Sequence, residues 1–217
     1  MRMLNTLTGL SLLLYSGFSL ADMTFLVQDQ DGKPLPDAVL EVVSDPVKPG
    51  DNSDLGIVDQ IEKAFVPELV VIQKGQLVDF PNSDNIRHHV YSFSPAKTFE
   101  LKLYADRPEE PVLFDQHGVV GLGCNIHDSM VGYIYIAADR RVSRTDHQGK
   151  TTLPVTSDTS QISVWHANQT KGPENRDIYT VGTLEQSADK QHYVVTLEVT
   201  PPPARDTFED TFRATFE

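Results

Sequence analysis

The feature that most restricts the fold is a pair of strand-like segments joined by a short loop, at residues 118–136. An apolar run that contains three glycines leads to Cys124, the only cysteine of the chain. After the loop, Tyr133 and Tyr135 alternate with Ile134 and Ile136. A period of two is typical of a β-strand with two different faces, so we expect a β-hairpin here and no helix.

Strand signals of the same kind recur about every 8–12 residues along the chain, separated by turn residues. No segment shows a convincing helical period, and we therefore predict an all-β sandwich or barrel. Pro67 indicates that its segment lies at a strand start or a sheet edge, because proline cannot donate a ladder hydrogen bond. The predicted strands include residues 23–29, 38–43, 57–61, 64–72, 77–80, 98–104, 112–114 and 193–199.

The composition is that of a folded, acidic protein. The chain has 217 residues, 39% of them hydrophobic, and a formal net charge of −13. This apolar content is enough to bury a core. The negative charge argues against nucleic acid as a partner, because phosphate binding needs a basic surface. It favours instead a partner with a basic surface.

The N-terminus is predicted to be a cleaved signal peptide, residues 1–21. Arg2 provides the positive end, residues 7–18 are largely apolar, and residues 19–21 form a small-x-small cleavage site. An uncleaved anchor is the alternative. No later stretch has 18 or more apolar residues, so we expect no transmembrane segment in the mature chain. Export by a signal peptide indicates a location in the bacterial periplasm or on the outer surface.

The loop itself carries a soft metal-ligand set. A lone cysteine in an exported protein cannot form an internal disulfide, and it is either a buried thiol, a reactive thiol or a metal ligand. Here His127 and Met130 follow Cys124 at intervals of three. Copper centres for electron transfer use two histidines, one cysteine and a weak axial methionine. The missing histidine is expected to be His88 or His89, and the pattern leaves the choice open because adjacent strand residues point to opposite faces.

Other chemistry suits these residues less well. Structural zinc normally takes several cysteines or histidines and no thioether. A cysteine nucleophile would need an orienting group beside its base, and none is visible in the sequence. Asn125 and Asp128 are candidates for hydrogen bonds that brace the ligand loop.

The spacing Cys124-x-x-His127-x-x-Met130 resembles the copper loop of cupredoxins, most closely that of amicyanin, and residues 87–90 fall where that family has Pro-His-Asn-Val. The segments around both motifs also resemble plastocyanin-like proteins labelled methylamine utilisation proteins. The resemblance covers about residues 57–138 and implies a Greek-key β-sandwich with one copper ion in a type 1 site. It implies His88, Cys124 and His127 as equatorial ligands and Met130 as the axial one, and it favours His88 over His89.

Residues 22–56 and 139–200 resemble carboxypeptidase-regulatory-like β-sandwich modules. The resemblance rests on the turn motif at residues 29–39, the Thr145–Leu153 hairpin pattern and the Trp165-His166 pair. We expect the cupredoxin-like sandwich of residues 57–138 to be inserted in this second sandwich, or joined to it as two domains in series. The acidic tail, residues 201–217, is expected to dock on a partner, to fray, or to pack on its own sandwich. It has three phenylalanines at intervals of four, Phe208, Phe212 and Phe216.

The sequence thus predicts a periplasmic electron carrier, not an enzyme, that cycles Cu(I) and Cu(II) and has a redox protein as its partner. One alternative is a copper-binding module for storage, delivery or sensing without redox turnover. Another is a scaffold or adhesion protein that binds no metal.

Overall fold

Alternation of apolar and polar residues favours β-strands, and strands occur in each part of the chain that the structure describes. A computed structural model describes residues 21–43, 54–108, 110–155 and 157–201. These ranges contain eighteen strands, one short 3-10 turn (Val181–Thr183) and no α-helix, so the predicted all-β fold is confirmed. The predicted signal peptide lies outside the described residues apart from Ala21, and the predicted tail lies outside them apart from Pro201.

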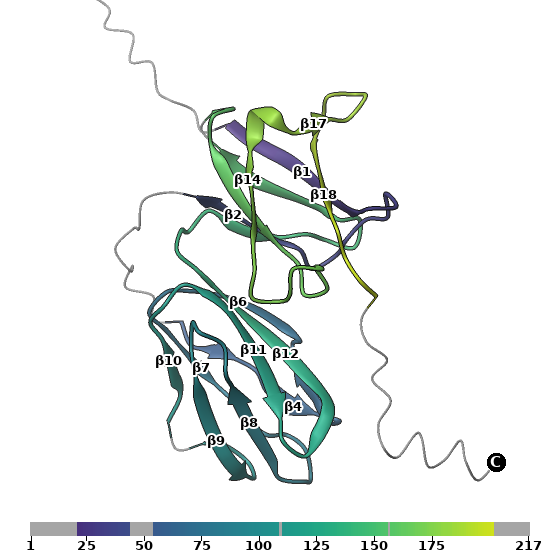
Figure 1. The fold of residues 1–217 in the computed structure, drawn as a ribbon. Helices are drawn as coiled ribbons and strands as arrows, with labels where there is room; N and C mark the ends of the chain where they lie inside the picture. The colour runs from purple at the N-terminus through teal and green to yellow at the C-terminus, as the bar shows by residue number, and fades with distance from the viewer. Residues whose placement is uncertain (1–20, 44–53, 109, 156, 202–217) are drawn as a thin grey trace, which may run out of the picture.

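The strands form two β-sandwiches, which Figure 1 shows one above the other. The central sandwich has a five-stranded sheet facing a three-stranded sheet, with a small β4–β5 hairpin beside them. The order in the large sheet is β6 (Leu69–Gln73), β12 (His127–Ala137), β11 (Gly118–Cys124), β8 (His88–Ser92) and β9 (Phe99–Tyr104). The order in the small sheet is β10 (Val112–Phe114), β7 (Gln76–Asp79) and β3 (Gly56–Ile57), and the hairpin pairs β4 (Asp59–Ile61) with β5 (Ala64–Val66).

The flanking sandwich combines strands from both ends of the described chain. Its first sheet has the order β14 (Lys150–Val155), β1 (Ala21–Asp29), β18 (Tyr193–Leu197) and β17 (Glu185–Gln186). Its second sheet has the order β13 (Val142–Arg144), β2 (Val39–Val43), β15 (Gln161–Trp165) and β16 (Asp177–Thr180). Strand β1 pairs with β18 in parallel, from Phe25 opposite Tyr193 to Asp29 opposite Leu197.

Each sandwich has its own apolar core. Phe25, Leu40 and Leu153 are fully buried in the flanking sandwich, and Phe80 and Phe114 are fully buried in the central one. Burial of such side chains contributes about 1.5–3 kcal/mol each. The two cores are therefore large enough to give rigid frames on which a site can be held.

The two sandwiches meet at the C-terminal end of β12. Tyr135 and Trp165 are fully buried there, with ring centroids 6.0 Å apart. The hydroxyl of Tyr135 donates a hydrogen bond of 2.8 Å to the buried carboxylate of Glu41 on β2. The backbone N–H groups of Ala138 and Asp139 donate to the other oxygen of Glu41, at 2.6 and 2.7 Å. This polar cluster joins the central sandwich to the flanking one.

Two predicted strands are wrong in their extent. Residues 57–61 form β3 and β4, which lie in different sheets. Residues 64–72 form two strands, with β5 ending at Val66 and β6 beginning at Leu69. Pro67 lies between them, which agrees with its inability to donate to a sheet ladder. The described part of the chain has no helix with the length and apolar character needed to cross a membrane.

Candidate metal centre

The cysteine loop joins β11 to β12 at one end of the large sheet. The two strands pair in regular antiparallel register from Gly118 opposite Ile136 to Gly123 opposite Val131. The register then shifts, so that Cys124 pairs with His127. Cys124 nevertheless keeps the alternation of β11, in which Val120, Leu122 and Cys124 are buried in one core cluster. His127 at the start of β12 is half-buried.

Strand β8 lies beside β11 and supplies the upstream histidine. His88, Val90 and Ser92 are buried, whereas the residues between them are less buried. This alternation puts the imidazole of His88 on the inner face, fully buried. His89 lies on the other face, where its Nε2 is 2.9 Å from Glu100 Oε1. The structure therefore brings His88 to the cysteine and directs His89 away from it.

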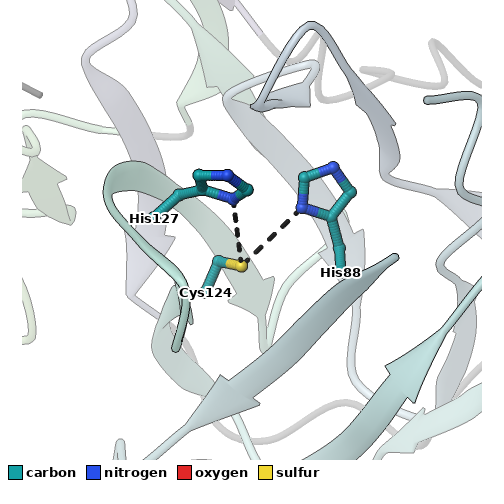
Figure 2. A group of neighbouring side chains, drawn as sticks. All are labelled: His88, Cys124 and His127. Atoms are coloured by element: carbon teal, nitrogen blue, oxygen red, sulfur yellow. Dashed lines mark hydrogen bonds between the residues drawn. The ribbon is translucent and has the colours of Figure 1, made fainter. Parts of the chain in front are cut away.

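Three side chains converge at this point. Figure 2 shows the imidazoles of His88 and His127 on either side of the Cys124 sulfur, each with a ring nitrogen turned toward it. The Nδ1 atoms of both histidines lie 3.8 Å from Cys124 Sγ, and the three ligand atoms all lie within 4.8 Å of one another. The convergence involves residues from three different strands.

The spacing of these atoms fits a shared metal ion. With bonds of about 2.0 Å to nitrogen and about 2.3 Å to sulfur, as found for zinc, ligands about 120° apart would place nitrogen and sulfur about 3.7 Å from each other. The observed 3.8 Å agrees with that value and exceeds the length of a strong hydrogen bond. Thiolate and imidazole are also the donor types that copper proteins combine. The donor set and its spacing thus fit copper.

Met130, the predicted axial ligand, lies close to this group. It is almost fully buried and belongs to the same core cluster as Cys124. Cys124 and Met130 also line one cavity, of about 370 Å³. The assignment of His88, Cys124, His127 and Met130 as metal ligands stays a prediction at this point.

A carboxylate that no sequence pattern indicated lies behind the buried histidine. Asp84 Oδ2 is 2.6 Å from His88 Nε2. Since a carboxylate accepts, Nε2 carries the proton, and the lone pair of Nδ1 faces the cysteine. Partial burial alone raises the pKa of Asp84, but N–H groups of the β4–β5 turn and the His88 imidazole outweigh burial and hold the pKa below its ordinary value. Asp84 therefore acts as an anion.

Two residues that were predicted to brace the ligand loop lie at the surface. Asn125 and Asp128, the expected braces of the ligand loop, are both exposed. An aromatic side chain covers the strand next to the cysteine instead. Tyr91 lies opposite Gly123, and a β-carbon on this glycine would come within 2.8 Å of the Tyr91 ring. The ring of Phe93, which is 80% exposed, follows 5.1 Å from that of Tyr91.

Comparison with protein-family models gives no match, and comparison with curated proteins gives none either. Among solved structures, the chain is similar to a copper-containing nitrite reductase from Thermus scotoductus, with 22% identity and a TM-score of 0.37. That match covers 42% of this chain and only 25% of the reductase. A purple cupredoxin from Nitrosopumilus maritimus matches with 20% identity and a TM-score of 0.33, over 38% of this chain and 97% of the cupredoxin.

Amicyanin from Paracoccus versutus matches with 20% identity and a TM-score of 0.33, over 45% of this chain and 96% of its own. Each of these superpositions covers less than half of this chain. The likeness of the flanking segments to carboxypeptidase-regulatory-like modules stays a prediction. The solved structures to which this chain is similar thus include cupredoxins, at low identity and over part of its length.

Proposed function

We propose that the protein is an exported type 1 copper protein of the periplasm that carries single electrons. In this proposal His88, Cys124 and His127 are the equatorial ligands of one copper ion and Met130 is its weak axial ligand. One observation carries the proposal: a thiol and two imidazole nitrogens from three strands lie within 4.8 Å of one another in a largely buried site. A thiol and two imidazoles match the equatorial ligands of blue-copper sites.

A copper ion held here would supply one-electron chemistry by cycling between Cu(I) and Cu(II). The protein's part is to keep the donors in place during that change. Cys124 and His88 project from neighbouring strands of one sheet into a packed core. Close-packed protein interiors resist rearrangement. Ligands that move little between oxidation states favour electron transfer over storage or delivery, which require release of the metal.

Exposure of the site is uneven, and this supports the electron-carrier proposal. His88 is fully buried, whereas His127 is half-buried and its neighbour Ile126 is 50% exposed. The edge at residues 125–127 is thus the place where a redox partner would come nearest to the donors. With a net charge of −13, the protein would attract a partner with a basic surface.

We also propose that the chain forms two domains, with residues 57–138 inserted between residues 22–56 and 139–200. Strands β1 and β2 share sheets with β13 to β18, while β3 to β12 share sheets only with one another among the described residues. This pairing supports an insertion over two domains in series. Strand β3 begins at Gly56, so the pairing of the central sandwich starts one residue earlier than the proposed boundary.

A copper-to-protein ratio measured together with a visible spectrum tests the function. We expect one copper per chain, intense thiolate-to-copper absorption and reversible loss of colour on reduction. Cys124→Ser is expected to abolish the colour, and persistence of the colour would show that the thiolate is not a ligand. Tight Cu(I) binding without colour on oxidation would favour storage or delivery, and no bound copper would leave a scaffold protein.

A further inference from the structure

The buried imidazole of His88 is held from both sides. Its Nδ1 faces Cys124 Sγ at 3.8 Å, and its Nε2 lies 2.6 Å from Asp84 Oδ2. The side chain of His88 is 0% exposed and that of Asp84 is 12% exposed. Water therefore has little access to weaken this contact, and charge-assisted hydrogen bonds of such length are among the strong ones.

The carboxylate of Asp84 is fixed in turn by the turn between β4 and β5. The backbone N–H of Glu62 donates to Oδ1 at 2.6 Å, and that of Lys63 donates to Oδ2 at 3.0 Å. Both turn residues have positive φ, 51° and 60°, which points two consecutive N–H groups at one anion. The N–H of Asp84 itself donates to Asn82 Oδ1 at 3.1 Å. The anion is thus placed before any metal binds.

We propose that Asp84 is a positioning residue that sets the reduction potential of the copper centre through His88. This inference rests on the proposed function. The bond to Asp84 fixes the tautomer that leaves Nδ1 free for a metal. It also makes the imidazole a stronger donor and adds a negative charge behind it. Both effects favour Cu(II), the more highly charged state, over Cu(I) and thereby lower the potential.

An isosteric substitution tests this inference. Asp84→Asn keeps the size of the side chain and one acceptor oxygen, but it removes the charge and replaces the other acceptor with an NH2 donor. The matched control is Asp59→Asn, because Asp59 binds the same loop without contacting the histidine. Its carboxylate accepts the Oγ–H and the N–H of Ser83, at 2.8 and 3.1 Å. Asp84→Glu, which retains the charge, serves as the conservative rescue.

The reduction potential is measured by voltammetry, and the affinities for Cu(I) and Cu(II) by competition with chelators. Circular dichroism of the metal-free proteins checks the fold. We expect Asp84→Asn to weaken Cu(II) binding about tenfold more than Cu(I) binding, a positive shift of about 59 mV for one electron. Asp59→Asn is expected to keep the wild-type potential, and Asp84→Glu to lie closer to wild type than Asp84→Asn does.

An unchanged potential in a folded, coloured Asp84→Asn protein would overturn the inference, and so would an equal shift in Asp59→Asn. Equal losses of Cu(I) and Cu(II) affinity would mean that Asp84 has only a structural role, and this result would also overturn the inference. If Asp84→Asn does not fold, Asp84→Ser is measured in its place against the same criteria. Failure of the proposed function is distinct, because the wild-type protein would then lack the colour and the reversible wave.

Discussion

Removal of the Glu41 carboxylate is predicted to destabilise the junction of the two sandwiches. Glu41 is buried and accepts from the Tyr135 hydroxyl and from the N–H groups of Ala138 and Asp139, and Arg176 Nη1 lies 3.5 Å from Oε2. Burial, and then the charge of Glu41, raise the pKa of the Tyr135 hydroxyl far above its ordinary value, so this group acts as a neutral donor.

The expected loss of unfolding free energy follows from the hydrogen-bond donors that would be left without an acceptor. Each buried donor without a partner costs about 1–3 kcal/mol. Breaking a buried charged group away from its partners costs about 3–5 kcal/mol as a whole. We therefore expect Glu41→Ala to lower the free energy of unfolding by about 3–5 kcal/mol. For a chain of this size that is a fall in Tm of about 6–20 °C.

Urea unfolding followed by tryptophan fluorescence provides the assay, because Trp165, the only tryptophan, lies against Tyr135 at this junction. The matched variant is Tyr135→Phe, which removes one hydroxyl and leaves both N–H bonds to Glu41 in place. It is expected to lose about 1.5–3 kcal/mol, the contribution of a hydrogen bond to a charged acceptor. If Glu41→Ala loses no more than Tyr135→Phe, the two amide bonds contribute nothing and the reasoning is refuted.

Three further outcomes are expected. Gly123→Ala should lower stability by about 1–3 kcal/mol because its β-carbon would meet the Tyr91 ring at 2.8 Å, while Gly121→Ala, whose β-carbon has its nearest contact at 3.8 Å, should be close to neutral in the same unfolding assay. Burial holds the pKa of His166 below its usual value near 6.5. Below about pH 6.5 the unfolded chain therefore binds a proton at His166 that the folded chain does not bind. The stabilisation present above about pH 6.5 should be lost as the pH falls toward the folded-state pKa. His166→Gln should flatten that part of the curve of unfolding free energy against pH. His89→Gln should retain one copper per chain and the visible spectrum, and loss of either would make His89 a ligand.

Much of the fold could be predicted from local patterns. Alternation along residues 133–136 indicated the strand that became β12. Pro67 indicated a strand start or a sheet edge, but the division of residues 64–72 into two strands was not predicted. The short strands β16 and β17 were not predicted, because pairing with β15 and β18 defines them more than their own residues do. Pattern alone left His88 and His89 open, and only the pleat of β8 beside β11 shows which of them faces Cys124.

The role of Asp84 could not be predicted from the sequence, for a physical reason. Nothing in its own sequence neighbourhood distinguishes it from other loop aspartates. Its role depends on N–H groups of the β4–β5 turn, about twenty residues upstream, and on the inward face of β8. Contacts between segments that are distant in the sequence leave no periodic pattern in it. A ligand loop within seven residues, in contrast, is visible as a regular spacing of its ligands.

The parallel pairing of β1 with β18 has a consequence for folding during synthesis. A chain that is made from its N-terminus displays β1 early, but the neighbour that covers one edge of β1 is made only with residues 193–197. All strands of the central sandwich have been made by then. Until that moment Phe25 and Val27 lack part of their native cover, which makes them ready ligands for a holding chaperone. The first strand to appear is thus among the last to be completed.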